Sequence, residues 1–158
     1  MNPPAIDFYV GTFRHSLDAK NRLTIPAKWR FAGDDVEGSY LALPNDNGSI
    51  TVYPGDMARE LYAKIRNVGM LSDPQEQSAL YNLFASADRF GCDAQGRIGL
   101  SEDLRNMAGL GKDVVLTGTM ATFHICSPEA YEAIRANRPA PNAGKAGYDR
   151  AILKKYGL

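Results

Sequence analysis

Residues 18–30 have the sequence DAKNRLTIPAKWR, and residues 93–105 have the similar sequence DAQGRIGLSEDLR. The two stretches align without a gap, with the same Asp, Ala and Arg at the start and apolar residues at matching later positions. Weaker similarity continues downstream, where apolar segments follow each stretch in the same order. Repetition of this kind indicates that the chain contains one small structural unit twice.

Both copies predict the same succession of elements. An apolar segment, residues 8–17 in the first copy, is typical of a strand and leads into a polar turn that ends in Asn21 or Gly96. Asn and Gly tolerate the left-handed backbone that such turns often need. A short alternating strand and a short helix follow, and two further strands complete each copy, at residues 40–43 and 50–53 and at residues 113–117 and 122–126.

Helices are predicted outside the repeated stretches. Residues 57–65 carry apolar side chains four residues apart, which form one stripe of a helix. Asp73 stands directly before a proline and has the position of an N-cap, so a second helix is expected to start there. A further helix is expected from Pro128, and a short tail helix over residues 148–156.

The order of these elements divides the chain into four parts. They are a first unit (residues 8–54), connecting helices (55–87), a second unit (88–128), and a C-terminal helix and tail (129–158). Because strands dominate both units, the fold class is predicted to be mixed α+β and rich in β-structure.

The overall composition is typical of a folded chain without a membrane segment. Hydrophobic residues make up 44% of the 158 residues, which supports a packed core. No apolar run approaches the roughly 20 residues that a membrane helix needs. The N-terminal sequence lacks the basic and apolar regions of a signal peptide. We therefore expect a cytoplasmic protein.

Charge is distributed unevenly along the chain. The 18 basic and 18 acidic residues give a net charge of zero, which counts against a strongly basic nucleic-acid binder. The segment from residue 14 to residue 30 nevertheless holds five Lys or Arg residues and only one acid, Asp18. A neutral chain of this kind can still present a local basic surface.

Motifs for catalysis or for a metal are missing from the sequence. It has no glycine-rich phosphate loop, no nucleophile elbow and no HExxH helix. Asp18 and Asp93 each have an Arg four residues later, which keeps a carboxylate ionised rather than tuned for acid catalysis. Cys92 and Cys126 are expected to be buried apolar residues, and His124 finds no further ligands at usable spacing. We predict no catalytic residue, no metal and no cofactor.

Residues 9–30 resemble the first unit of the MraZ family of bacterial transcriptional regulators. That family has a Gly, an apolar-Asp-x-Lys-Gly-Arg turn, an apolar-x-Ile-Pro segment and a short basic helix. This chain supplies the matching residues Gly11, Leu17, Asp18, Lys20, Arg22, Leu23, Ile25 and Pro26. In the second copy the match consists of Asp93, Gly96, Arg97 and the stretch GLGKDVVLTG at residues 109–118. The chain departs from the pattern at Asn21, which replaces a Gly, and at Gly99 and Ser101, which replace a more apolar residue and a Pro.

The resemblance implies two AbrB-type units of the swapped-hairpin form in one chain. Such units make a β-barrel with pseudo-two-fold symmetry, flanked by helices. The resemblance also implies a transcriptional regulator that binds double-stranded DNA and assembles with itself into a ring. Rings of this family bind short G-rich direct repeats ahead of division and cell-wall genes, so a nucleoid-associated protein is expected.

Lys20 and Arg22 are the main candidates for DNA contact, because Arg can hold a guanine edge or a phosphate with two hydrogen bonds. The other candidate DNA-binding residues are Arg14, His15, Asn21, Lys28, Gln95 and Arg97. Asp18 and Asp93 are candidates for a structural role, since each can pair with the Arg that follows it. The alternative is that Arg22 only ties its turn and the basic residues form a solvated face. Trp29 is expected in the core rather than as a platform for base stacking.

The two turns are not expected to be equivalent. The first carries Lys20 where the second has Gln95, and the other basic residues of segment 14–30 are expected beside the first turn. Glu102 and Asp103 are expected beside the second turn, where they would repel phosphate. Arg22 is therefore expected to contribute more to DNA binding than its counterpart.

Other functions remain open on the sequence alone. A protein-interaction or antitoxin-like module would use the same fold without reading DNA, and the net charge of zero favours it. An enzyme is the weakest alternative, because the catalytic motifs are missing.

Overall fold

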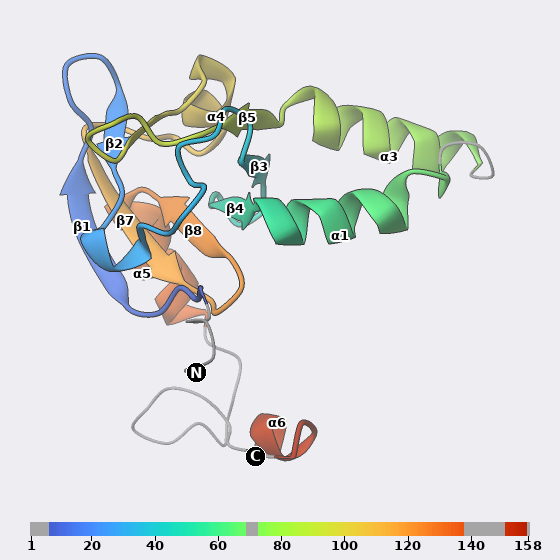
Figure 1. The fold of residues 1–158 in the computed structure, drawn as a ribbon. Coiled ribbons are helices and arrows are strands. Elements are labelled where there is room, and N and C mark those ends of the chain that lie inside the picture. The colour runs from blue at the N-terminus through green and yellow to red at the C-terminus, as the bar shows by residue number, and fades with distance from the viewer. Residues whose placement is uncertain (1–6, 69–72, 138–150, 158) are drawn as a thin grey trace, which may run out of the picture.

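The computed structural model describes residues 7–68, 73–137 and 151–157, and it shows a mixed α+β fold built mainly on antiparallel strands (Figure 1). In these residues the first copy of the repeat contributes β1 (Thr12–Ser16), β2 (Arg22–Thr24), β3 (Tyr40–Pro44) and β4 (Ile50–Pro54). The second copy contributes β5 (Asp88–Phe90), β6 (Arg97–Gly99), β7 (Asp113–Gly118) and β8 (Phe123–Cys126).

The strands pair across the two copies of the repeat. A six-stranded sheet has the order β1-β7-β8-β4-β3-β5, and β2 pairs with β6 in a separate two-stranded ribbon. The first strand of each copy lies beside the third strand of the other, and the two second strands and the two fourth strands pair with each other. The order of the sheet is unchanged when the two copies are exchanged. These pairings do not show the closed barrel that the resemblance implies, because β1 and β5 are the edge strands of the sheet among the described residues.

Trp29 lies in the core, as predicted. Only 1% of it is exposed, and its ring lies 5.1 Å from that of Phe13 and 5.3 Å from that of Phe123 between ring centroids. Its indole Nε1 donates a hydrogen bond to the Val10 carbonyl over 3.1 Å. The buried indole therefore joins the start of the chain to the sheet through both apolar and polar contacts.

Two elements are shorter than the sequence predicts. The first strand begins at Thr12 rather than at residue 8, because Tyr9 forms only an isolated bridge with Met120. The helix expected after β2 is a single 3-10 turn, η1 (Ala27–Trp29), whereas its counterpart is a helix, α4 (Glu102–Met107). The difference follows from the caps: Ser101 Oγ accepts a hydrogen bond from the Leu104 amide, while the residue before η1 is a proline without a side-chain acceptor.

The remaining helices are α1 (Gly55–Ile65), α3 (Pro74–Ala85), α5 (Pro128–Ala136) and α6 (Ala151–Lys154). Asp73 caps α3 as predicted, because its carboxylate accepts a hydrogen bond from the Glu76 amide over 2.9 Å. In Figure 1, α1 and α3 extend together to one side of the sheet, and no residue of either helix is fully buried. The tail helix occupies part of the predicted range, whose first residues, 148–150, lie outside the described residues. Within the described parts of the chain, no helix is both long and apolar enough to cross a membrane.

Candidate nucleic-acid interface

The β2–β6 ribbon carries the two repeated turns, one at each end. Its strands are antiparallel, and Leu23 lies opposite Ile98. Both of these side chains are 0% exposed and belong to the core. Because side chains alternate along a strand, the positions on either side of them point away from the core. We call this outer surface the ribbon face; it consists of Arg22, which lies opposite Gly99, and Thr24, which lies opposite Arg97.

The first turn is held together by Asp18. The Asp18 carboxylate accepts hydrogen bonds from the amides of Lys20 and Arg22, both over 2.9 Å, and from Arg22 Nε over 2.7 Å. Its backbone amide donates to the Arg22 carbonyl, and its carbonyl accepts from the Asn21 amide. Asn21 has a φ of 59°, the left-handed backbone that Asn tolerates better than most residues. The turn thus presents exposed Lys20 and Asn21 at its tip.

The second turn repeats this arrangement bond by bond. The Asp93 carboxylate accepts from the amides of Gln95 and Arg97, both over 2.9 Å, and from Arg97 Nε over 2.8 Å. Gly96 takes the place of the left-handed asparagine, with a φ of 78°. One further bond has no counterpart in the first turn: Arg97 Nη2 donates to Gln95 Oε1 over 3.2 Å.

The hydrogen bonds keep both aspartates ionised. The pKa of Asp18 and the pKa of Asp93 lie below their usual value, in each case first because the amide of the following arginine donates to the carboxylate. The charged aspartate in turn orients the arginine through Nε. Within the described residues, neither terminal nitrogen of Arg22 makes a hydrogen bond, so its guanidinium can still bind a ligand while Asp18 holds it. One terminal nitrogen of Arg97 is already occupied.

Arg30, which follows β2, lies beside the second turn, which corrects the placement expected from the sequence. The Ile25 amide donates to the Gly96 carbonyl over 2.8 Å, so the chain leaving β2 passes the second turn. The Arg30 guanidinium packs over Gly96 so closely that a side chain at position 96 would collide with it. Arg30 also pairs with Asp34 over 3.2 Å, which compensates its charge. Lys28 is exposed on η1.

The acids at the start of α4 lie on the side of the first turn, which is the opposite of the expected placement. Glu102 and Asp103 follow the end of β6, and that end lies opposite Arg22. The cause is the antiparallel ribbon, which brings the segment after each second strand to the turn of the other copy. The register therefore brings the start of α4 toward the first turn, and repulsion of phosphate by these acids stays a prediction.

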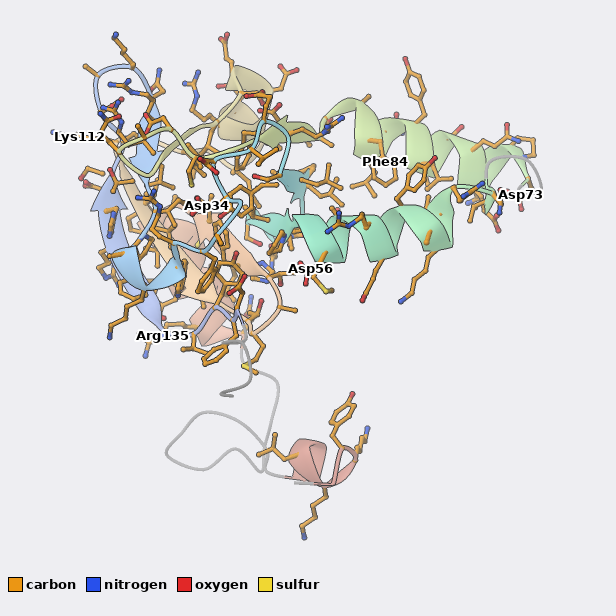
Figure 2. The ribbon with its side chains drawn as sticks, viewed as in Figure 1. Asp34, Asp56, Asp73, Phe84, Lys112 and Arg135 are labelled. Carbon is orange, nitrogen blue, oxygen red and sulfur yellow. The ribbon has the colours of Figure 1, made fainter. Side chains whose placement is uncertain are left out.

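Lys112 is a basic neighbour of the first turn that the sequence analysis missed. The Leu17 amide donates to its carbonyl over 2.8 Å, directly before Asp18. Figure 2 shows Lys112 at the side of the molecule where Figure 1 labels β2. Its side chain is exposed and makes no ion pair among the described residues. The sequence shows only that Lys112 precedes a predicted strand. That this strand pairs with β1 is visible only in the structure.

Arg14 and His15 lie on β1 rather than on the ribbon. The Arg14 guanidinium lies 5.3 Å from the centre of the Tyr131 ring and 3.6 Å from Glu132 on α5. His15 is half-buried on the neighbouring position of the strand, opposite Val114. The structure therefore brings together the two turns and Lys112, but it directs Arg14 to α5.

The two cysteines and His124 are buried or half-buried in the part of the chain that the structure describes. Cys92 and Cys126 are free thiols and buried, as predicted. His124 Nδ1 lies 3.2 Å from Thr51 Oγ1, and burial lowers the pKa of this imidazole. Among the described residues, no group of three or more His, Cys, Asp or Glu side chains could hold a metal ion.

A cavity of about 1010 Å³ opens away from the ribbon, between the loop after η1, β3 and the α1 and α3 helices. Its walls include Tyr40 from the core and Leu61 and Ile65 from α1. Phe84 reaches it from α3, and Figure 2 shows this residue between the two helices. Arg22 and Arg97 take no part in lining it.

Comparison with known proteins gives one consistent family. A family model described as "MraZ protein, putative antitoxin-like" matches residues 83–152. A protein named "Transcriptional regulator MraZ" from Mycolicibacterium gilvum (strain PYR-GCK) is 37% identical over 124 residues, 78% of this chain and 84% of the relative. The protein of the same name from Rhodococcus jostii (strain RHA1) is 37% identical over 134 residues, 82% and 88% of the two chains. A third, from Corynebacterium urealyticum (strain ATCC 43042 / DSM 7109), is 35% identical over 148 residues, 91% and 96% of the two chains.

Proposed function

The chain belongs to the MraZ family of transcriptional regulators, and from this premise we propose that it binds double-stranded DNA in a sequence-specific manner through the ribbon face. The name that its relatives carry describes a regulator and not a class of enzyme. Strands of each copy pair with strands of the other, which supports two AbrB-type units, residues 8–54 and 88–128. We propose that the two units close into one pseudo-two-fold barrel.

The observation that carries the proposal is the placement of Arg22 and Arg97 on one outward face. They occupy diagonal positions of an antiparallel pair, which lie roughly 7–8 Å apart. That spacing corresponds to about two steps of duplex DNA at 3.4 Å a step. A two-stranded ribbon of this width fits the major groove, where an arginine can donate to N7 and O6 of one guanine. Two arginines held at such a spacing support recognition of short G-rich sequences.

The tips of the turns supply the remaining contacts of the ribbon. Lys20 and Asn21 from the first turn and Gln95 from the second are proposed to flank the two arginines. Lys112 is proposed as a phosphate contact at the first turn, because it is an exposed cation whose carbonyl bonds to Leu17, directly before that turn. Lys28 is proposed as a further phosphate contact, because it is an exposed cation on η1. Arg14 and His15 remain proposed contacts from β1, with Arg14 leaving its exposed pair with Glu132 when DNA is near.

Self-assembly into a ring is proposed as the way in which one small face reads several repeats. A single ribbon covers only a few base pairs, and linking several ribbons raises the overall affinity. The α1 and α3 helices support this, since isolated helices of their length are marginal in water and neither buries a single residue fully in one chain. The proposed sites are direct repeats upstream of division and cell-wall genes, bound in the cytoplasm at the nucleoid.

A protein-interaction or antitoxin-like role is the second candidate. It is favoured by the description of the matching family model and by the net charge of zero. The same fold would then use α1 and α3 to bind a partner protein, and the ribbon face would not be needed for binding.

Binding to DNA from upstream of the chain's own gene, compared with a scrambled duplex over a salt series, separates the two candidates. We expect preference for the upstream DNA, and an affinity that falls steeply with salt because phosphate contacts release counterions. Light scattering on the same samples should give a mass above the 17.3 kDa of one chain. Equal binding to both duplexes, or binding that ignores salt, would contradict the proposal and favour the second candidate.

A further inference from the structure

Gly99 lies on the ribbon face at the end of β6, where the fold itself does not require a glycine. A Cβ atom built at this position would meet no heavy atom within 4 Å, and its φ lies outside the left-handed region. Other glycines have clear structural reasons: at Gly118 a Cβ would collide with the backbone of Tyr9, and at Gly96 with the Arg30 guanidinium. A strand position with open space around it would accept a β-branched residue, which strands prefer.

The counterpart of Gly99 in the first copy is Thr24, which has a side chain and is exposed. Thr24 lies opposite Arg97, and Gly99 lies opposite Arg22. The ribbon face therefore has a side chain beside one arginine and bare backbone beside the other. A glycine inside a strand often marks a place where a ligand or another backbone comes close.

We propose that the backbone at Gly99 is the place where DNA approaches the ribbon most closely, and that Thr24 is a specificity-determining residue beside the other arginine. This inference rests on the proposed function. With no side chain at position 99, the ribbon can lie flat enough for the terminal nitrogens of Arg22 to reach a base edge. The Thr24 methyl and hydroxyl groups lie where they can meet a neighbouring base, for example the methyl group of thymine. The two halves of the face then read different bases, although the turns are alike.

A graded series at position 99 tests the close approach. Gly99→Ala and Gly99→Val are expected to melt at the temperature of the unchanged chain or above it, because the added atoms point into open space. Affinity for the upstream DNA is expected to fall with side-chain size, tenfold or more for Gly99→Val. The salt dependence should stay the same, since the phosphate contacts remain. Ala121→Val is the matched control, because it adds a valine to the exposed β7–β8 turn and should bind as the unchanged chain does.

Thr24→Gly tests the second half of the inference. It makes the two halves of the face alike, and it is expected to reduce the preference for upstream over scrambled DNA at least threefold. Affinity for the scrambled duplex should stay within twofold, because no charge is removed.

The outcomes separate this inference from the proposed function. If the unchanged chain prefers its upstream DNA but Gly99→Val binds it equally well, the close approach is overturned and the proposed function stands. A lower melting temperature in Gly99→Val also overturns it, because the glycine would then serve the fold. An unchanged preference in Thr24→Gly overturns the role of Thr24. A chain that has no preference for its upstream DNA overturns the proposed function and this inference together.

Discussion

Replacement of Arg22 by alanine is expected to weaken binding to the upstream DNA more than the same replacement of Arg97. Both residues lie on the ribbon face, but among the described residues neither terminal nitrogen of Arg22 makes a hydrogen bond, while Arg97 Nη2 already donates to Gln95. Loss of a bidentate contact to guanine costs about 1–3 kcal/mol per site. The loss is multiplied when several subunits bind one DNA molecule, so the measured affinity should fall by more than tenfold.

The similarity of the two turns makes each variant a control for the stability of the other. Each arginine forms the same set of bonds with its aspartate, so the two substitutions should change the melting temperature by similar amounts. Melting temperatures of both variants are therefore measured first. Binding is then measured by fluorescence anisotropy with labelled upstream DNA. If both variants fold normally and Arg97→Ala binds more weakly than Arg22→Ala, the second turn is the main reading element and the present assignment is wrong.

Replacement of Trp29 by alanine is expected to destabilise the fold by about 3–5 kcal/mol, as is usual for removal of a buried aromatic side chain. The side chain is 1% exposed, and it contacts rings from the start of the chain and from β8. The Val10 carbonyl would also lose its donor. Urea unfolding measures the loss, because the midpoint falls with the free energy of unfolding.

Trp29→Phe serves as the control for size, since it keeps most of the apolar volume and removes only the indole donor. A smaller loss of stability is expected for this variant than for Trp29→Ala. The opposite assignment, in which Trp29 stacks on DNA bases, predicts normal stability and weak DNA binding for Trp29→Ala. That result would contradict the place of Trp29 in the core.

Local features of the fold could be predicted from the sequence because each depends on neighbouring residues. The hydrogen bonds of the two turns follow from the Asp-x-x-x-Arg spacing, and the starts of α3 and α4 follow from Asp73 and Ser101. The repeat itself predicts that the two copies contribute the same succession of strands. The extent of η1 was not predictable in the same way, because apolar spacing does not distinguish one 3-10 turn from a short helix.

The surroundings of each turn could not be predicted, because they depend on pairing between distant segments. The antiparallel register of β2 and β6 places Arg30 at the second turn and the start of α4 at the first. The pairing of β1 with β7 brings Lys112 beside Leu17. Sequence proximity assigned Arg30 to the other turn and gave no place to Lys112, although it identified both turns correctly. The proposal that the turns bind DNA depends on Arg22 and Arg97 lying on one outward face. That face exists only because β2 and β6 pair, so neither copy of the repeat forms it alone.

Crosslinking from a single thiol on the ribbon face tests the central claim most directly. Cys92 and Cys126 are 5% and 3% exposed, so a photoactivatable label will react mainly with a new exposed cysteine. Thr24→Cys places the label opposite Arg97 and two residues from Arg22 on the same strand, and Ser78→Cys places it on the exposed surface of α3 as a control. We expect the label at position 24 to crosslink to the upstream DNA and the label at position 78 not to do so. Crosslinking from position 78 without crosslinking from position 24 would show that the chain binds DNA through another surface, and would contradict the account.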